Sequence, residues 1–338
     1  MRETHQDLAD KIWKNLDDDE RNASRFGRQN LKNFGWRWAK RPKIWQTKFE
    51  KILDDDERKG PRFGRQNLKK FWMTMNERSE VKGMKIVNNE ESIGIFDSGI
   101  GGVTVLKEII KILPNENYKY YSDSKNNPYG DKTDEEIIKI CNKIVSNFIE
   151  QKCKAIVIAC NTASAKAAKT LREKYPETPI IAIEPAYKMV HDYAYDQVTL
   201  VMATKGTIES EKFHKLYNKY DNHKTYLMAC HGLADIIEEG NQEKIKDYLK
   251  KNLKEYIGKI HNVVLGCTHY PLIQNEIKEV LGDVEFFNGA SSLAKHLKDI
   301  LEEKDLISDS KSKGTVEFTD SSNSEYKRER FLRQLGQS

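Results

Sequence analysis

Two stretches of the chain, about a hundred residues apart, share one local pattern. Each begins with a short run rich in Val and Ile, in KAIVIACNTA (residues 154–163) and in NVVLGCTHYP (residues 262–271). Each run ends at a small residue and a cysteine, Cys160 or Cys267, followed by side chains with hydroxyl or amide groups. Short apolar runs of this kind are typical of buried parallel strands. Because open α/β sheets bind ligands at the carboxyl ends of their strands, the pattern predicts one pocket with a thiol on each side.

Predicted strands alternate with predicted helices from residue 92 onward. The first unit, SIGIFDSGIGGVTVLKEIIKIL (residues 92–113), is typical of a strand, a glycine-rich turn and an amphipathic helix. Near the end of the sequence, GTVEFTD (residues 314–320) suggests an edge hairpin and EYKRERFLRQL a closing helix. The alternation predicts an α/β fold with parallel sheets and right-handed crossovers. A thiol-bearing turn in each half indicates two pseudo-symmetric halves.

The charge of the chain is unevenly divided. The 338 residues carry a formal net charge of +5. Residues 1–83 contain 21 Lys and Arg against 14 Asp and Glu, whereas the rest of the chain contains 36 against 38. All five tryptophans also lie in residues 1–83. The basic character therefore belongs to an N-terminal arm, and the main body is close to neutral.

The arm contains an internal repeat, because residues 16–34 (LDDDERNASRFGRQNLKNF) return 37 residues later as residues 53–71 (LDDDERKGPRFGRQNLKKF). Basic side chains interleaved with aromatic ones can contact phosphates and stack on bases. The acidic cluster in each unit opposes such binding. We favour a solvated appendage with no core of its own, since two copies are too few for a solenoid. The segment MKIVNNEESIGIF also suggests Met84 as the native start, which would leave the arm outside the native enzyme.

The composition also bears on the compartment. No apolar run approaches the roughly 18 residues that a membrane helix needs, and MRETHQDLADKIWKNLDDDE lacks the features of a secretory signal. Five cysteines without a CxxC pair indicate neither a disulfide framework nor a zinc finger. We therefore expect reduced thiols, a cytoplasmic protein, no metal site, and neither a membrane nor a nucleic acid as a partner.

Two further loops carry polar side chains at predicted strand ends. Asp97 and Ser98 precede a glycine-rich turn whose helix N-terminus can bind a carboxylate. The loop NNPYG (residues 126–130) follows the second predicted strand, and Thr133 with Glu136 predicts a capping box at the next helix. Either loop alone fits an ordinary turn, and the glycine spacing lacks the full dinucleotide-binding pattern.

Taken together, these motifs resemble those of glutamate racemase, in the cofactor-independent aspartate/glutamate racemase superfamily. FDSGIGG, PYG after a YxD strand, ACNTA and GCTHYP occur in that family's order and approximate spacing, over about residues 92–335. The resemblance implies two pseudo-symmetric open parallel-sheet domains with the active site between them, preceded here by the N-terminal arm. The implied bounds are residues 84–187 plus 289–338 for the first domain and 188–288 for the second.

Carried over to this sequence, the family's pattern implies that Cys160 and Cys267 are the acid and base thiols, assisted by Asp97, His269 and Glu238. The substrate-binding residues that it implies are Asp97, Ser98, Pro128, Tyr129, Gly130, Asn161, Thr162, Thr204, Thr207, Thr268 and His269. Many members have a proline-containing run where this chain has HGLADIIEEG (residues 231–240), so Glu239 is an alternative to Glu238. The segment FFNGASSLA follows the family's final strand only loosely.

The chemistry explains why two thiols are needed. Racemisation removes a proton from one face of Cα and returns one to the other, which suits two bases on opposite sides, one as thiolate and one as thiol. His269 and the helix after Cys267 would lower the pKa of that thiol. Asp97 is anionic and would not stabilise a Cys160 thiolate, so we expect it to accept or relay a proton. The donors that could bind the carboxylate are Asn161, Thr162 and Thr268. No lysine context indicates a pyridoxal cofactor, and we expect none.

The resemblance predicts the interconversion of L- and D-glutamate, which supplies D-glutamate for peptidoglycan and so for cell-wall biogenesis and cell shape. We also expect a homodimer. The alternatives are an aspartate racemase of the same superfamily, a nucleic-acid-binding protein acting through the arm, and an isomerase or hydrolase that uses one cysteine. We expect Cys141, Cys153 and Cys230 to be packing residues and His231 to be a turn residue.

Overall fold

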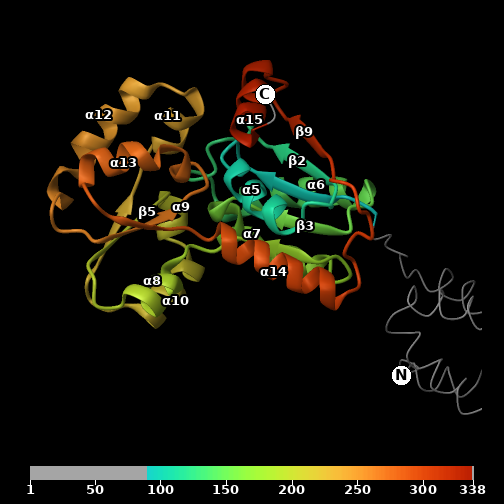
Figure 1. The fold of residues 1–338 in the computed structure, drawn as a ribbon, viewed down its shortest axis with the longest axis horizontal. Helices are drawn as coiled ribbons and strands as arrows, with labels where there is room; N and C mark the ends of the chain where they lie inside the picture. Colours follow the sequence, from blue (N-terminus) through green and yellow to red (C-terminus); the bar gives the residue numbers. More distant parts are fainter. Residues whose placement is uncertain (1–89, 337–338) are drawn as a thin grey trace, which may run out of the picture. The chain divides into compact units, whose positions relative to one another are not determined.

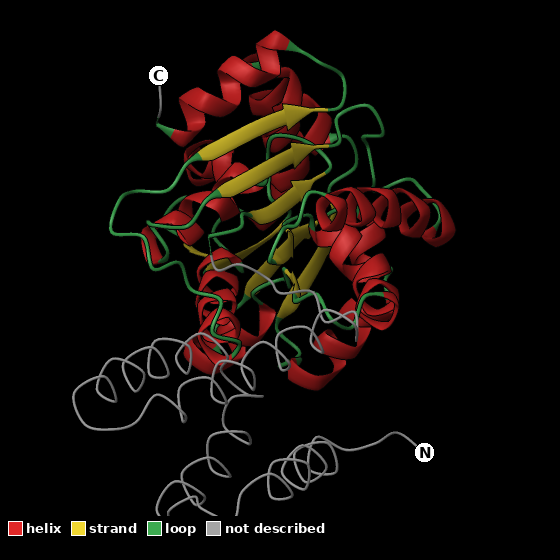
Figure 2. Ribbon diagram, turned by 90° about the vertical axis from the view of Figure 1, so that its right-hand side faces the viewer, coloured by secondary structure: helices red, strands yellow, loops and turns green. Residues whose placement is uncertain are grey.

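A computed structural model describes residues 90–336 of the chain. The N-terminal arm, its repeat and the suggested start at Met84 lie outside the described residues, so the predictions made for them stay predictions. The described residues form two all-parallel sheets with helices packed on both faces, and Figure 2 shows the strands of both sheets in yellow among the red helices. The expected α/β fold with parallel sheets is therefore confirmed.

The first sheet and its helices form what we call the first lobe. Its five strands lie in the order β4-β3-β1-β2-β9. The strands are β1 (Ile93–Asp97), β2 (Tyr118–Ser122), β3 (Ala155–Ile158), β4 (Ile180–Ala182) and β9 (Val316–Asp320). The helices are α5 (Val103–Ile112), α6 (Asp134–Glu150), α7 (Asn161–Lys174), α14 (Ala290–Glu303) and α15 (Glu325–Leu335).

Two details of the first lobe test the sequence predictions directly. The expected edge hairpin at residues 314–320 is wrong. This segment forms the single strand β9, which pairs in parallel with β2, and a parallel neighbour needs a crossover instead of a tight turn. The capping box at the start of α6 is confirmed, because Thr133 and Glu136 exchange side-chain and backbone hydrogen bonds.

The second sheet and its helices form the second lobe. Its four parallel strands lie in the order β6-β5-β7-β8. The strands are β5 (Thr199–Ala203), β6 (Thr225–Ala229), β7 (Asn262–Gly266) and β8 (Glu285–Phe287). The helices are α8 (Tyr187–Ala194), α9 (Lys205–Ile208), α10 (Glu211–Tyr220), α11 (Leu233–Glu239), α12 (Gln242–Leu253), α13 (Gln274–Leu281), and the short 3₁₀ segments η1 (Lys254–Tyr256) and η2 (Tyr270–Ile273).

The two sheets repeat one topology. In each, the second strand along the chain lies beside the first, the third lies on the other side of the first, and the fourth follows the third. Strands β3 and β7 are therefore equivalent; Cys160 lies two residues after the end of β3, and Cys267 follows β7 directly. The strand order reverses between the first and third strands of each sheet, which is where α/β sheets bind ligands. The domain bounds expected from the sequence stay a prediction.

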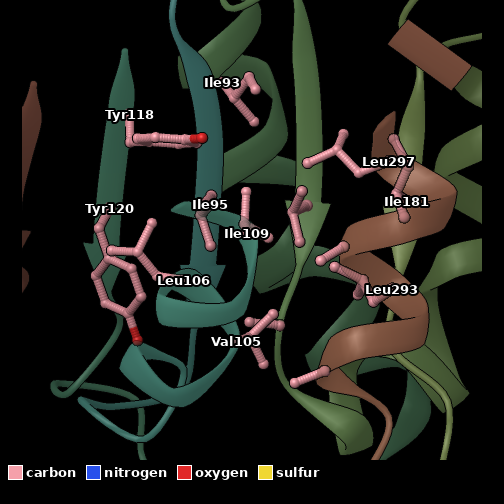
Figure 3. Packing of buried hydrophobic residues seen from close by; sticks show 14 of the residues in the cluster. Ile93, Ile95, Val105, Leu106, Ile109, Tyr118, Tyr120, Ile181, Leu293 and Leu297 are labelled. Atoms are coloured by element: carbon pink, nitrogen blue, oxygen red, sulfur yellow. The ribbon is translucent and has the colours of Figure 1, made fainter. Parts of the chain in front are cut away.

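Each sheet is buried on both faces by alternate side chains. In the first lobe Ile93 and Ile95 point into one core with α5 and α14, and Figure 3 shows them in the same cluster as Leu106, Leu293 and Leu297. The intervening strand residues, such as Phe96, Ile156 and Ile158, join the core formed with α6 and α7. This double burial is complete in β1, β3, β5 and β7 and explains why these strands are largely continuous apolar runs without polar alternation.

The second lobe is built in the same way. Leu200, Met202 and Val263 pack under α11, α12 and α13, whereas Val201 and Val264 pack against α8 and α10. Figure 1 shows these two groups of helices on opposite sides of β5. None of the helices in residues 90–336 is long and apolar enough to cross a membrane.

Candidate active site

A cavity lies at the carboxyl ends of the strands of both sheets. The described residues that line it come from both lobes. The lining residues that the sequence predicted are Ser98, Pro128, Tyr129, Gly130, Cys160, Asn161, Thr162, Thr204, Cys267, Thr268 and His269. Both thiols therefore border the same space, and each is buried, with relative exposures of 5% for Cys160 and 7% for Cys267.

Cys160 follows β3 and occupies the N-cap position of α7. Its sulfur lies 3.8 Å from Ser98 Oγ. Burial, followed by the negative charge of Asp97, raises the pKa of the Cys160 thiol to about 12. The backbone N–H of Ala163 in the first turn of α7 acts in the opposite direction and does not offset these effects. Cys160 is therefore a protonated thiol at neutral pH in this state of the protein.

Cys267 has a different neighbour, the imidazole of His269. Its sulfur lies 3.6 Å from His269 Nδ1, and His269 Nε2 lies 2.6 Å from Glu238 Oε1. Burial alone would lower the pKa of His269, but the hydrogen bonds to Cys267 and Glu238 and the charge of Glu238 raise it well above its usual value. A doubly protonated imidazole donates from both nitrogens, so it can stabilise a thiolate on Cys267 while bonded to Glu238.

Glu238 is held in its ionised form. Burial would raise its pKa, but the hydrogen bond and charge of His269, the charge of Lys327 and the backbone N–H of Ile100 bring it down to about 2. Ile100 N–H donates to Glu238 Oε1 at 2.6 Å. The neighbouring Glu239 is exposed and pairs with Lys244. Of the two glutamates that the sequence left open, the structure thus places Glu238 beside His269.

The glycine-rich turn after β1 makes room for this pair. A Cβ atom on Gly99 would lie 2.0 Å from Glu238 Oε1, and one on Gly101 would lie 2.6 Å from His269 Nδ1. Atoms at such distances overlap, so any larger residue would displace the Glu238–His269 pair. These glycines let a turn of the first lobe contact the Glu238–His269 pair of the second lobe directly.

Asp97 lies behind the cavity lining and is fully buried. Its carboxylate accepts hydrogen bonds from Gly102 N–H at 2.9 Å and from the Thr268 hydroxyl at 3.2 Å. Burial raises the pKa of Asp97, and the charge of Glu238 acts in the same direction, against the lowering effects of His269, Gly102 and Thr268. Asp97 therefore influences Cys160 by its charge and holds Thr268 by a hydrogen bond.

Three threonines form a hydroxyl cluster across the two lobes. Thr162 Oγ1 lies 2.8 Å from Thr204 Oγ1 and 3.4 Å from Thr207 Oγ1, and the Thr204 and Thr207 hydroxyls are 3.0 Å apart. Thr204 also caps the short helix α9. Thr162 and Thr204 border the cavity, whereas Thr207, like Asp97 and Glu238, is not among the lining residues.

Several lining residues were not predicted from the sequence. They are Asn127, Asp131, Lys205, Cys230, His231, Gly232, Ala234, Asp235 and Gly266. Asn127 Nδ2 donates to Asp235 Oδ1 at 2.9 Å, which joins the PYG loop to α11. Cys230 belongs to the core of the second lobe, as expected, and also borders the cavity. Like the other two cysteines, Cys230 follows a predicted strand, so the sequence did contain a signal that it could border the cavity.

Two thiols and several polar groups border the cavity. Asn161 Oδ1 is a buried acceptor with no hydrogen-bond partner among the described residues, so an ammonium or hydroxyl group in the cavity could donate to it. Within residues 90–336, no group of three or more His, Cys, Asp or Glu side chains is placed to hold a metal ion. The thiols and the His269 imidazole beside the cavity are groups that can transfer protons to and from a bound molecule.

Comparison with known proteins agrees with this geometry. The Asp/Glu/Hydantoin racemase family model matches residues 105–297. A glutamate racemase of Clostridium perfringens is 43% identical over 234 residues, which are 68% of this chain and 90% of that protein.

Two solved structures are similar along most of their length. The glutamate racemase of Francisella tularensis, in complex with D-glutamate, has a TM-score of 0.64 and 32% identity, and the match covers 73% of this chain and 94% of that one. The Escherichia coli glutamate racemase, in complex with L-glutamate and an activator, has a TM-score of 0.63 and 28% identity, covering 72% and 92%. The chain therefore belongs to the Asp/Glu/Hydantoin racemase family and, within it, to the glutamate racemases.

Proposed function

We propose that this enzyme interconverts L- and D-glutamate without a cofactor, by moving protons between the substrate Cα and two thiols, Cys160 and Cys267. The observation that carries the proposal is the placement of these thiols. They follow equivalent strands of the two sheets and border one cavity. A molecule bound between them would present opposite faces of its Cα to the two sulfurs, which is what a two-base racemisation requires.

The proton transfers balance over one turnover. With one enantiomer bound, the Cys267 thiolate takes the Cα proton, and the Cys160 thiol gives its proton to the opposite face. The enzyme is then left with a Cys267 thiol and a Cys160 thiolate, which is the form that acts on the other enantiomer. The starting form is supported by the raised pKa of Cys160 and by the imidazole of His269 beside Cys267.

The surrounding side chains have distinct proposed tasks. The residues that we propose to contact the substrate are those that border the cavity: Ser98, Pro128, Tyr129, Gly130, Asn161, Thr162, Thr204, Thr268 and His269. Asn161 Oδ1 would accept a hydrogen bond from the substrate ammonium, and hydroxyl and backbone N–H donors would bind the carboxylates. Asp97, Thr207 and Glu238 would act through the residues that they contact, because they lie behind the lining.

The proposed test measures optical activity directly. The full chain is mixed with L-glutamate, and the circular dichroism signal of the substrate is followed with time. It should decay to zero, and D-glutamate should give the mirror-image curve. Prior treatment with hydroxylamine, which removes pyridoxal cofactors, should leave the rate unchanged. An unchanged dichroism signal would contradict the proposal.

The substrate range has a matched comparison in aspartate, whose side chain is one methylene shorter. Glutamate is favoured because the compared relatives are glutamate racemases. We expect kcat/KM for aspartate to be lower by roughly tenfold or more, since a missing methylene costs about 1–3 kcal/mol of transition-state binding. A higher kcat/KM for aspartate would make the enzyme an aspartate racemase.

We also propose that the D-glutamate serves peptidoglycan synthesis, and through it cell-wall biogenesis and cell shape. Membership among the glutamate racemases supports this role. Expression of the chain should free a bacterium that requires external D-glutamate from that requirement, whereas the Cys160→Ser variant should not. A cytoplasmic location and a homodimer stay predictions, and light scattering of the purified protein checks the second.

A further inference from the structure

Side chains of helix α15, which packs on α5 and β9, reach the end of α11, the helix that carries Glu238. Tyr326 OH donates to the Glu239 carbonyl at 2.9 Å, and Arg330 Nη1 donates to the Glu238 carbonyl. Gly240 ends α11 in the left-handed conformation, which disfavours other residues there, and a Cβ would lie 2.7 Å from Tyr326 OH. The end of α11 is therefore shaped to receive α15.

One side chain of α15 reaches the catalytic pair itself. Lys327 Nζ lies 3.5 Å from Glu238 Oε2, with 21% of the lysine side chain exposed and 6% of the glutamate. The other oxygen, Oε1, already accepts from Ile100 N–H and lies 2.6 Å from His269 Nε2. Oε2 is buried and has no hydrogen-bond partner among the described residues, so the Lys327 ion pair is its one recorded polar contact.

We propose that Lys327 is a positioning residue for the second thiol, holding the Glu238 carboxylate so that His269 stays in contact with Cys267. The chain of contacts runs from Lys327 through Glu238 and His269 to the sulfur. The ion pair stabilises both the orientation of the Glu238 carboxylate and its ionised form. If the carboxylate turned away from Lys327, Oε2 would be a buried charge without a counter-ion. This inference rests on the proposed role of Cys267 as a base.

The structure offers a sharp contrast with the first thiol. In residues 90–336 the recorded neighbours of Cys160 are Ser98, Asp97, the first turn of α7 and, by its charge, Cys267, and no recorded hydrogen bond or ion pair of these residues joins Lys327 to Cys160, Ser98 or Asp97. A change at Lys327 should therefore affect proton transfer at Cys267 and leave proton transfer at Cys160 intact. A general loss of folding would affect both equally.

Steady-state racemisation cannot separate the two thiols, because enantiomers have equal free energy and kcat/KM must change equally in both directions. Half-reactions can separate them. In Cys160→Ser, Cys267 alone should exchange the Cα proton of one enantiomer with D₂O, and in Cys267→Ser, Cys160 alone should exchange that of the other enantiomer. Proton NMR of each glutamate enantiomer in D₂O measures these rates.

Lys327→Met is then introduced into both single-cysteine backgrounds. We expect exchange by Cys267 to slow roughly tenfold, the factor that corresponds to about 1.4 kcal/mol, and exchange by Cys160 to stay within about twofold. Lys327→Arg keeps the cation and should restore most of the Cys267 rate. Arg328→Met, which removes an equal charge from an exposed position of α15, should change neither rate.

Equal slowing in both backgrounds, or no slowing in either, would overturn the proposal. So would failure of the arginine variant to rescue, since a positioning role depends on the cation. Lys327→Gln and thermal unfolding of every variant separate a kinetic effect from a loss of folded protein. If each single-cysteine protein exchanged both enantiomers, the two-thiol assignment would fail, and the role proposed for Lys327 with it.

Discussion

Cys160 and Cys267 occupy equivalent positions in two sheets of the same topology, yet their surroundings differ in charge. Burial, and after it the negative charge of the buried Asp97 carboxylate, raises the pKa of Cys160 to about 12, although Ser98 beside the sulfur acts in the opposite direction. Cys267 lies against His269, which is bonded to the buried carboxylate of Glu238. No imidazole separates Cys160 from the Asp97 carboxylate. The imidazole of His269, in contrast, lies between Cys267 and the Glu238 carboxylate.

The comparison shows that the positions of the two sulfurs and the charges around them are set by different parts of the structure. The repeated strand order places both sulfurs at the carboxyl ends of their sheets and so on one cavity. The groups that set charge are not repeated in the same way. Asp97 ends β1 of the first lobe, whereas Glu238 comes from α11 of the second and is held by α15. Equivalent strand ends of the two sheets therefore present thiols in unequal electrostatic surroundings.

The largest expected effect comes from removing either sulfur. Cys160→Ser and Cys267→Ser should each reduce racemisation by roughly a thousandfold or more, because a serine hydroxyl is far too weak an acid to replace a thiol in proton transfer. Circular dichroism of each glutamate enantiomer measures the loss. Cys141→Ala, which removes a fully buried thiol on α6, should retain racemisation. If only one of the two Ser variants lost activity, the enzyme would use a single cysteine.

A smaller effect should follow from neutralising the carboxylate behind the second thiol. Glu238→Gln removes the charge that helps to keep the pKa of His269 high, so the imidazole stabilises a Cys267 thiolate less well. We expect kcat/KM to fall by roughly a hundredfold, and equally for both enantiomers. Glu239→Gln is the matched control, since its side chain is exposed and pairs with Lys244. Similar losses in both variants would contradict the contact chain described here.

A third prediction concerns Asp97, the carboxylate whose charge helps to raise the pKa of Cys160. Asp97→Asn removes a negative charge that raises the pKa of Cys160, so the alkylation of Cys160 by iodoacetamide should reach its half-maximal rate at a lower pH. Racemisation should fall by roughly tenfold, because the substitution also alters the hydrogen bond to Thr268. Peptide mass spectrometry measures the alkylation of each cysteine separately. Cys230 is an internal reference, because its raised pKa has no contribution from Asp97; an equal shift at Cys230 would refute the explanation.

Much of the fold follows from patterns that a sequence displays locally. Strands buried on both faces are continuous apolar runs, and helices between them carry one apolar side, so alternating segments predict parallel sheets. Strand β9 was mistaken for a hairpin because its burial is only partial and its partner β2 lies far away in the sequence. Likewise, no local signal predicts that Lys154 before β3 forms a buried ion pair with Glu116.

In the candidate site, too, some features follow from local sequence patterns and others depend on how distant segments pack together. The strand-end motifs contain both cysteines and most lining residues, because the carboxyl ends of parallel strands meet at one edge. The choice between Glu238 and Glu239 could not be made from the sequence, since adjacent helical residues point about 100° apart and the rotation of α11 decides which one faces inward. Lys327 was missed because its contact with Glu238 depends on how α15 packs.

The smallest expected effect is on protein stability, and it concerns the pH dependence of the stabilisation that Glu238 provides. The folded pKa of Glu238 is about 2, below the 4.5 of an ordinary glutamate, after the opposing effects of burial and of His269 and Lys327 are combined. A depressed carboxyl pKa contributes stability that is fully present above pH 4.5 and is lost as the pH falls toward 2. The difference in unfolding free energy between the wild-type protein and Glu238→Gln, measured by urea denaturation, should therefore shrink by up to ~3 kcal/mol across that window.

The corresponding difference for Glu239→Gln should stay nearly constant, because that carboxylate is exposed. A Glu238→Gln difference that did not change with pH would mean that the glutamate contributes packing alone and that the charge beside the second thiol has another source.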